Sequence, residues 1–555
     1  MATIQKTQQS KLNKALENDR LKLGLAVLIA IAAAVITLSL FGIRYQTNDD
    51  ATLSNIAAGA YGDTLHMVYV NVLFSLMLRP LYALVQTNWY VIVQVVLVVI
   101  SLAAIIYTLM KKLGLVTGTV ISLAVMVAFS QHIFYTFQYT ECSFIMLSAG
   151  ILLITDNLGD CNKSVLLGIL LALMGSMVRW TSFYAVGGLS AALLLYKFFT
   201  LNKEGKKRAV VTMVALFAVT FGAKAVDVAA YKTNPEWDKF TRYNSARTQY
   251  SDFKVLSLTE ENPFEHLGVS DIDYVMLNNW DFYDKARFDT ELLEELSAGG
   301  QDITAIQLVK NTVKQIIKMM TGKSYHYMFL AVALLSLLRL RPKWSVVPMI
   351  GMYGTFGVLM LYLIYEMRFP SWVEMGLIWT ITAYALYCIG EISPNKIASA
   401  VVAVGVLYSI IAISMPAYVD LYNTYMDYET WTKEEQHYFE AMSRDKENIY
   451  LLSTTSINVA AGFDVMNPRT DGFYSNIVAY GGWLSRAPHR NRALAEYGLE
   501  RPLVDAVDNP NVYLDYHNID KSARYARQEL GCDVYVVKTG ENDFAPYQLV
   551  TQKPE

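Results

Sequence analysis

Residues 23–50 read LGLAVLIAIAAAVITLSLFGIRYQTNDD, and this stretch decides the fold. Residues 23–43 are uncharged and lie between Lys22 and Arg44. A helix of about 20 apolar residues crosses a hydrocarbon core of about 30 Å. Since the apolar region of a secretory signal has only about 7–15 residues, we interpret residues 23–43 as an uncleaved first span.

Similar apolar blocks recur along the chain and predict a mainly α-helical, polytopic membrane protein. Of the 555 residues, 54% are hydrophobic and 17% are charged, whereas soluble domains average about 25% charged residues. We expect eleven spans, at residues 23–43, 89–110, 113–131, 137–155, 164–179, 181–200, 209–230, 326–341, 345–366, 370–391 and 397–416.

Charged residues near the spans predict the orientation in a cell membrane, because Lys and Arg at span ends face the cytoplasm. Val68–Val85 is apolar but contains Arg79 and Pro80. If Val68–Val85 does not cross the membrane, the basic clusters near the other spans all lie on the cytoplasmic side, together with the N-terminus. These clusters are Lys111/Lys112, Lys203–Arg208, Arg339/Arg341/Lys343 and Lys396.

This orientation divides the chain into three parts. Residues 1–22 form a cytoplasmic tail, 23–416 a transmembrane domain with external loops 44–88 and 231–325, and 417–555 an extracytoplasmic domain. The segments 231–325 and 417–555 carry a net charge of −12, so the rest of the chain carries +9 of the total of −3. An acidic exterior and a basic interior agree with the orientation rule.

The segment 417–555 is predicted to be an α/β domain. Strands are expected at Asn448–Thr454, Asn511–His517 and Cys532–Lys538, which are rich in Val, Tyr, Ile and Leu. Helices are expected at Ala493–Tyr497 and Ser522–Leu530, with Gly498 and Gly531 after their ends. We expect a binding or lid role for this domain. Gly481–Gly482–Trp483 is either a carbohydrate-stacking corner or a turn beside a core tryptophan.

The loop 231–325 contains an amphipathic pattern after Gly299–Gly300. Asp302 is expected to cap a helix whose apolar stripe runs from Ile303 to Met320. Such a helix lies on the membrane surface, leads into the next span, or packs against the domain.

Asn48–Asp49–Asp50 follow the first span directly. Two adjacent carboxylates at a membrane surface are costly unless they are capped, paired or used. Asp50 is expected to cap a helix over Ala51–Ala60, which leaves Asp49 without an explanation. At least one of the two acids is a candidate catalytic residue.

A first span followed at once by an acidic pair and an external loop resembles the GT-C class of membrane glycosyltransferases. The resemblance implies transfer of a sugar from a polyprenyl-phosphate donor to a glycan or protein acceptor outside the cell. It also implies that Asp49 or Asp50 is the catalytic base. The chain is further similar to uncharacterised multi-pass proteins of Gram-positive bacteria, through Asn88–Trp89–Tyr90, Asp273–Tyr274, Asn279–Trp280 and Gly481–Gly482–Trp483.

The growing charge on a lipid-phosphate leaving group needs cations or backbone donors. Arg179 is the strongest candidate, because it lies between two apolar runs where an unpaired charge is expensive. The other candidates for binding the donor phosphate or the substrate are Arg79, Arg247, Arg368, His66, Glu141, Tyr250 and Trp483.

No cofactor is required by default, although two adjacent acids could bind Mg²⁺ or Mn²⁺. The cysteines Cys142, Cys161, Cys388 and Cys532 suggest neither a zinc site nor a disulfide framework. There is no basic stripe for nucleic acid.

Two other functions stay open. A polysaccharide polymerase or ligase that uses diphosphate-linked oligosaccharides would use the loop 231–325, with Arg247 and His266 as candidates. A transporter of lipid-linked glycans is a non-enzyme alternative, but the inverted repeats and broken central spans of transporters are not apparent.

Overall fold

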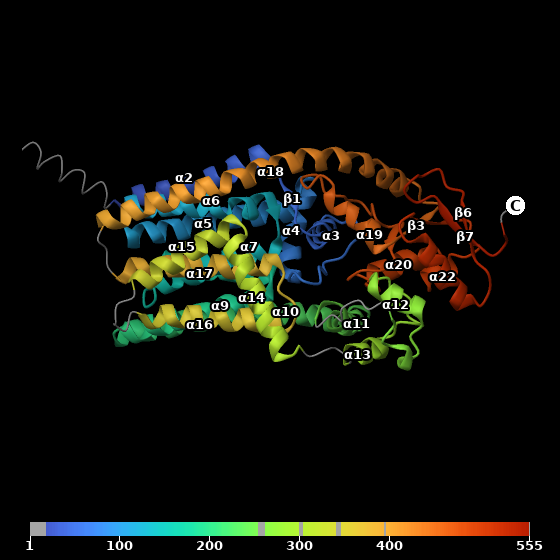
Figure 1. Ribbon diagram of the computed structural model, residues 1–555, viewed down its shortest axis with the longest axis horizontal. Coiled ribbons are helices and arrows are strands. Elements are labelled where there is room, and N and C mark those ends of the chain that lie inside the picture. The colour runs from blue at the N-terminus through green and yellow to red at the C-terminus, as the bar shows by residue number, and fades with distance from the viewer. Residues whose placement is uncertain (1–17, 254–260, 299–302, 340–345, 393–395, 554–555) are drawn as a thin grey trace, which may run out of the picture.

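The computed structural model describes residues 18–553, except for 254–260, 299–302, 340–345 and 393–395. Long apolar helices form a bundle at one end of the molecule, and a β-sheet with short helices lies at the other (Figure 1). We call the end of the bundle that faces this sheet the sheet end.

The prediction of a mainly helical, polytopic protein is confirmed. Among the described residues, eight helices are long and apolar enough to cross a membrane. They are α2 (Asp19–Phe41), α5 (Trp89–Leu113), α6 (Leu115–Ser130) with the π-helical turn η1 (Gln131–Tyr135), α7 (Tyr139–Asp156), α9 (Trp180–Thr200), α10 (Lys203–Lys232), α16 (Val347–Tyr365) and α17 (Ser371–Ile392).

The other three predicted spans are helices as well, so the count of eleven stays a prediction. α8 (Lys163–Val178) and α15 (Ser324–Arg339) have 16 residues each, or about 24 Å at 1.5 Å per residue. α18 (Lys396–Arg444) has 49 residues, runs along the bundle and continues to the β-sheet (Figure 1). Its apolar part extends over Val406–Asp420.

Two short helices follow the first span. α3 (Asn48–Ala57) starts two residues earlier than Asp50, so Asp50 lies in the first turn and does not cap this helix as expected. α4 (Val72–Leu84) has 13 residues, or about 20 Å, which is short for a crossing. This length agrees with leaving Val68–Val85 out of the predicted spans.

The amphipathic helix is present as α14 (Ala305–Thr321). The expected cap, Asp302, lies outside the described residues; Thr304 caps the helix in a reciprocal pair with Gln307. Its apolar stripe is exposed, and Ile306 retains 81% of its accessible surface. An exposed apolar stripe beside the bundle is typical of a helix at a membrane surface. On the other face, Gln315 and Lys318 bind Glu374 of α17.

α7 is the central helix of the bundle and packs closely on α8. Ser143 of α7 donates to the carbonyl oxygen of Gly175 in α8 at 2.8 Å. A Cβ on Gly150 would lie 2.6 Å from the carbonyl oxygen of Gly168 and 2.7 Å from the backbone nitrogen of Ala172. Small residues allow this approach of two backbones, as in other membrane helix pairs.

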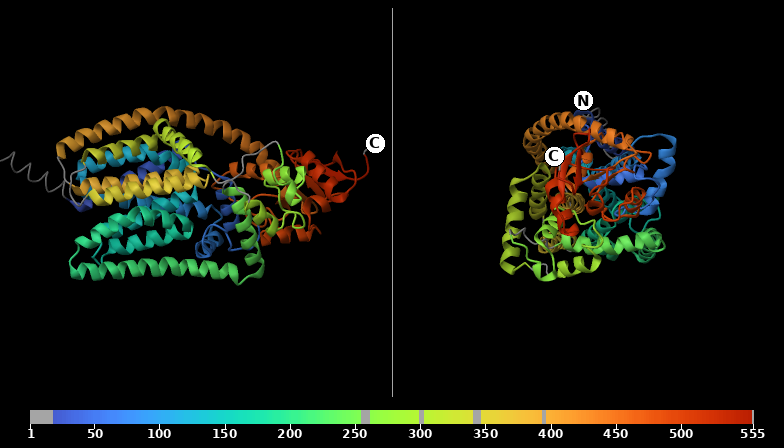
Figure 2. Two further views of the ribbon diagram at one scale, coloured as in Figure 1. Left: turned by 60° about the horizontal axis from the view of Figure 1, so that its bottom comes forward. Right: turned by 90° about the vertical axis from the view of Figure 1, so that its right-hand side faces the viewer.

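Within the described residues, five strands form a mixed sheet in the order β4-β3-β5-β7-β6. β3 pairs in parallel with β4 and β5, and β7 is antiparallel to β5 and β6. The strands are β3 (Ile449–Leu452), β4 (Ile477–Ala479), β5 (Val512–Leu514), β6 (Tyr535–Lys538) and β7 (Tyr547–Val550). The views in Figure 2 agree that the sheet lies beyond one end of the bundle.

β3, β5 and β6 lie within the three predicted strands, whereas β4 and β7 were not predicted. Helices accompany the sheet on both sides of β5 in the sequence: α19 (Thr454–Ile457), the 3₁₀ helix η4 (Asn458–Gly462), α20 (Pro488–Glu496), α21 (Pro502–Asp505) and α22 (Ile519–Leu530). α22 ends at Gly531, in the left-handed conformation, as predicted.

Three helices of the segment 231–325 lie against this assembly: α11 (Pro235–Asp252), α12 (Asp271–Asn278) and α13 (Thr290–Ala298). Asp284, which lies between α12 and α13, accepts hydrogen bonds from Arg501 and Tyr525. The two predicted external segments therefore pack on each other.

The α7–α8 packing predicts that Gly150→Leu destabilises the bundle by about 1–3 kcal/mol or more, because the new side chain has no space. The melting temperature of the purified protein in detergent should fall. Gly187→Leu in α9 is the matched control, because no atom lies within 4 Å of a Cβ at this position. Equal melting temperatures for the two variants would contradict the packing argument.

Candidate functional site

Asp50 anchors the sheet end of the bundle. It is fully buried, and its Oδ1 accepts the backbone N–H of Tyr139, the first residue of α7, at 2.9 Å. The hydroxyls of Thr47 and Tyr90 donate to the same carboxylate at 3.2 and 3.5 Å. β1 (Arg44–Tyr45) and β2 (Thr136–Phe137) pair in parallel beside this contact. Asp50 is therefore held by contacts within the bundle, and it is not among the residues that line the cavity described below.

Asp49 lines a cavity of about 380 Å³ between the bundle and the sheet. This volume lies within the range of about 300–1,000 Å³ typical of small-molecule sites. The described residues that line the cavity are Thr47, Asn48, Asp49, Tyr69, Tyr139, Arg179, Arg247, Asp252, Trp280, Arg368, Trp372, Thr454, Asn458, Gly482 and Trp483.

Arginines from three separate parts of the chain meet in this cavity. Arg247 of α11 and Arg368, which precedes α17, both approach Asp252, at 3.7 and 2.6 Å. Arg179, between α8 and α9, donates to the hydroxyl of Tyr139 at 2.8 Å. Its guanidinium also lies over the ring of Tyr69, 4.9 Å from the centroid. In the described lining, three guanidiniums (+3) with the carboxylates of Asp49 and Asp252 (−2) give a formal charge of +1.

Asp49 has a different environment from Asp50, although the two residues are adjacent. Burial raises the pKa of the Asp49 carboxyl above its ordinary value, and the guanidinium of Arg179 opposes this increase. Asp252 raises this pKa further, whereas Arg247 and Arg368 lower it. The result is a partly buried carboxyl group with a raised pKa that faces the cavity.

Aromatic rings form much of the remaining lining. Trp280, Trp372 and Trp483 come from three different segments. Trp280 lies 5.3 Å from the guanidinium of Arg247, and Trp483 packs against Tyr69 at 4.9 Å between ring centroids. Tryptophan faces beside polar side chains provide apolar surface with a few directing groups, the usual composition of a ligand site.

The carboxyl ends of β3 and β4 form the far wall of the cavity. Thr454 and Asn458 follow β3, and Gly482 and Trp483 follow β4. Ligands of parallel sheets bind at this edge as a general rule. The backbone N–H of Gly482 donates to the carbonyl oxygen of Trp280 at 2.8 Å, which joins the sheet to the segment 231–325.

Asp281 supports the same wall. It is almost fully buried and accepts the hydroxyl of Thr454 at 3.1 Å. Burial raises its pKa to about 7, against the lowering effect of the hydrogen bonds from Thr454. A Cβ on Gly481 would lie 2.7 Å from Oδ1 of Asp281, so only glycine fits there.

Five of the candidate residues meet in the cavity: Asp49, Arg179, Arg247, Arg368 and Trp483.

The other predicted site residues do not line the cavity. Arg79 pairs with Asp63 at an exposed position. His66 stacks on Trp237 at 4.5 Å, and Tyr250 packs against Phe264. The candidate of the polymerase alternative, His266, is exposed and also lies outside the described lining.

Glu141 is buried in α7 and does not line the cavity. Neither of its carboxylate oxygens has a hydrogen-bond partner among the described residues. Its electrostatic neighbours are Lys323 and Asp50. A substrate role in the cavity is therefore not supported for Glu141.

Sequence reasoning missed Asp252, Trp372, Thr454 and Asn458 as lining residues. Asp252 ends the polar stretch Arg242–Asp252 of the sequence. Its contacts with Arg247 and Arg368 follow only from the fold. No local pattern marks Thr454 and Asn458, because their place depends on which sheet edge faces the bundle.

Among the described residues, no three His, Cys, Asp or Glu side chains come together as a metal site would require. Comparison with protein-family models, curated proteins and solved structures gave no significant match.

The buried Asp281 predicts a pH-dependent stability. Because its pKa is about 7 when folded and about 3.9 when unfolded, folding favours the protonated acid. The stabilisation is complete below the unfolded pKa and is lost as the pH rises through the folded pKa. The slope is at most about 1.4 kcal/mol per pH unit.

The melting temperature of the wild type should therefore fall from pH 5 to pH 8 more steeply than that of Asp281→Asn, which cannot ionise. Asp520→Asn, an exposed acid of α22, is the matched control and should keep the wild-type profile. Parallel profiles for the wild type and Asp281→Asn would exclude this role of Asp281.

Proposed function

We propose that this chain is a membrane glycosyltransferase that takes a sugar from a polyprenyl-phosphate donor, with Asp49 as general base. The observation that carries the proposal is the placement of the Asp49 carboxylate in one cavity with three arginines and three tryptophans. The resemblance to the GT-C class names the reaction, and the chemistry of the cavity supports it.

A hydroxyl of the acceptor is a weak nucleophile and needs a base within hydrogen-bond reach. The raised pKa of Asp49 makes its carboxylate a stronger base than an exposed aspartate. The carboxylate removes the proton of the acceptor hydroxyl as this oxygen attacks the anomeric carbon. The bond from this carbon to the phosphate oxygen breaks, and the configuration inverts.

The charge of the arginine group favours a monophosphate donor. Once Asp49 has taken up the proton of the acceptor, Arg179, Arg247, Arg368 and Asp252 leave a formal charge of +2, which balances a lipid monophosphate leaving group of charge −2. A diphosphate leaving group would keep an excess negative charge. Since guanidiniums bind phosphate oxygens through paired N–H groups, the group stabilises the charge that grows on the departing phosphate.

The proposed membrane arrangement follows the charge distribution of the sequence. The sheet end faces outward and receives a glycan or protein acceptor, and the N-terminus is cytoplasmic. The donor's polyprenyl chain stays in the bilayer beside the bundle, and its phosphate enters the cavity. No cofactor is part of the proposal; loss of transfer on addition of EDTA would show a requirement for Mg²⁺ or Mn²⁺.

Asp49→Asn should lower the rate of sugar transfer by about 10²–10⁴-fold, the typical contribution of a general base. The measurement is transfer from polyprenyl-phosphate sugars to acceptor glycans by the purified protein in lipid nanodiscs. The melting temperature should stay near that of the wild type, because no hydrogen bond in the described structure depends on the Asp49 carboxylate.

Asp520→Asn is the matched control for this substitution, since it removes an exposed acid far along the chain from the cavity, and it should retain full transfer. Full transfer by Asp49→Asn would contradict the proposed base. Turnover of diphosphate-linked oligosaccharides alone would instead support a polymerase or ligase.

Arg179→Gln should reduce transfer by about 10²–10³-fold, the effect of removing one stabilising donor from a transition state. Arg79→Gln is the matched control, because Arg79 forms an exposed ion pair with Asp63 outside the cavity. Its rate should stay within about twofold of the wild type. The same loss in both variants would show that the cavity arginine has no special role.

A further inference from the structure

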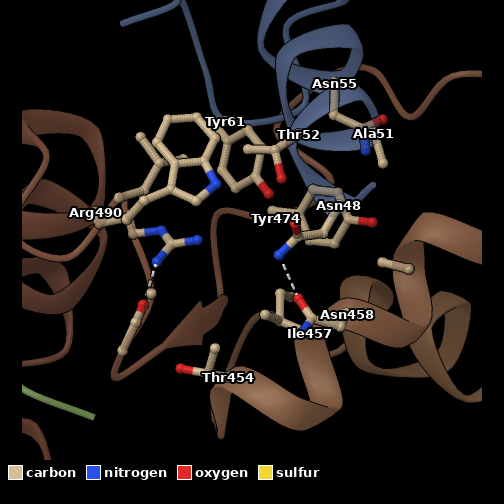
Figure 3. Close-up of a pocket in the computed structure, with 15 residues that line it drawn as sticks. Asn48, Ala51, Thr52, Asn55, Tyr61, Thr454, Ile457, Asn458, Tyr474 and Arg490 are labelled. Atoms are coloured by element: carbon tan, nitrogen blue, oxygen red, sulfur yellow. Dashed lines mark hydrogen bonds between the residues drawn. The ribbon is translucent and has the colours of Figure 1, made fainter. Parts of the chain in front are cut away.

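A small side pocket opens beside the cavity. Its volume is about 30 Å³, and it shares five lining residues with the cavity: Asn48, Thr454, Asn458, Gly482 and Trp483. Figure 3 shows Arg490 on one side of the pocket, Asn48 and Asn458 on the other, and Tyr61 between them. The side pocket is therefore a polar extension of the proposed active site.

Arg490 brings a buried charge to this pocket. The side chain is 6% exposed, and its Nη1 donates to the carbonyl oxygen of Gly481 at 3.1 Å. No acid contributes to its electrostatic environment in the described structure, where the rings of Tyr61 and Tyr283 are the neighbours. By contrast, Arg501 is paired with Asp284. A buried charge without a partner is costly, so an uncompensated guanidinium in a pocket indicates an anion site.

Two residues that line the pocket each carry a buried polar atom without a partner in the described part of the chain: Nε of Arg490 and the hydroxyl of Tyr474. Tyr474 is 2% exposed. Tyr61 lies near both residues, because its ring stacks on Tyr474 at 4.9 Å between centroids and it is an electrostatic neighbour of Arg490. Since buried polar atoms are normally satisfied, two orphan donors in one pocket point to a ligand that accepts hydrogen bonds.

The size of the pocket limits the ligand. A water-sized group needs about 10–15 Å³ of such space, so the pocket holds about two of them. A carboxylate, with two oxygens in one plane, fits this space and matches the planar fork of a guanidinium. A whole sugar ring does not fit, and would have to remain in the larger cavity against Trp483.

We propose that the side pocket binds the carboxylate of an acidic sugar, with Arg490 and Tyr474 as its donors. The ring of this hexuronate lies in the main cavity, and its carboxylate points into the pocket. The inference rests on the proposed function for the direction of the chemistry, but the binding itself does not require transfer. Either the transferred sugar or the acceptor sugar carries the carboxylate.

The test measures binding of free hexuronates to the full chain in nanodiscs of neutral lipid. Glucuronate, galacturonate and mannuronate are each compared with the parent hexose by calorimetry or ligand-observed NMR. At least one uronate should bind about tenfold or more tightly than its hexose, the effect of one charge-assisted contact. An equal affinity for all uronates and their hexoses overturns the proposal.

Arg490→Gln should abolish this preference, and Arg492→Gln is the matched control. Arg492 lies two residues further along α20 and its side chain is 57% exposed, so its loss should leave the preference unchanged. A preference that survives Arg490→Gln overturns the proposal.

Tyr474→Phe keeps the test decisive if Arg490→Gln does not fold. This change removes only a hydroxyl without a partner, so the melting temperature should stay equal or rise. The uronate preference should fall by about threefold or more. An unchanged preference would show that the pocket holds only water.

Asp49→Asn separates this proposal from the proposed function, because it should keep the uronate preference while it lowers transfer by about 10²–10⁴-fold. Preference without transfer activity in the wild type supports the pocket and contradicts the glycosyltransferase. Transfer activity without a preference for uronates supports the glycosyltransferase and contradicts the pocket. If the protein is active, the KM values of Tyr474→Phe assign the carboxylate to one substrate. A higher KM for a uronosyl donor assigns it to the donor, and a higher KM for a uronate acceptor assigns it to the acceptor.

Discussion

The hydrogen bond from the backbone N–H of Tyr139 to Asp50 is the contact on which the arrangement of the site depends. A carboxylate at the N-terminus of α7 satisfies a helix donor that has no intrahelical partner and interacts favourably with the helix dipole. It also fixes α3 against the bundle. Because Asp49 precedes Asp50 in the first turn of α3, the burial of one acid sets the direction of the other, which faces the cavity.

The cavity combines two structural rules that usually apply to different classes of protein. Helices of a membrane bundle bury polar side chains toward its interior, which brings Arg179 and Tyr139 together. Parallel strands present their carboxyl ends to a ligand, which brings Thr454 and Trp483 to the opposite wall. Neither half encloses a site alone, and the segment 231–325 completes it with Arg247 and Trp280.

The sequence predicted those features that depend on local composition. Apolar length gave the positions of the bundle helices, and the unexplained acid after the first span identified Asp49. Asp50 was expected to cap the helix that follows it, but it caps α7 through the backbone N–H of Tyr139. Because Tyr139 lies 89 positions further along the chain, no local pattern indicates this contact. Arg79 and Arg179 have similar apolar surroundings in the sequence, but only tertiary structure distinguishes an exposed pair with Asp63 from a place in the cavity.

The arginines of the cavity act on Asp49 as well as on a phosphate, and this coupling has a consequence for the proposed reaction. Without a donor, Arg179, Arg247 and Arg368 oppose the effect of burial and lower the pKa of Asp49. A bound phosphate cancels much of their charge, and it adds a negative charge beside the carboxylate. Both effects raise the pKa of Asp49. The carboxylate is then most basic when the donor is in place, so that the strength of the base depends on the presence of the sugar that the acceptor attacks.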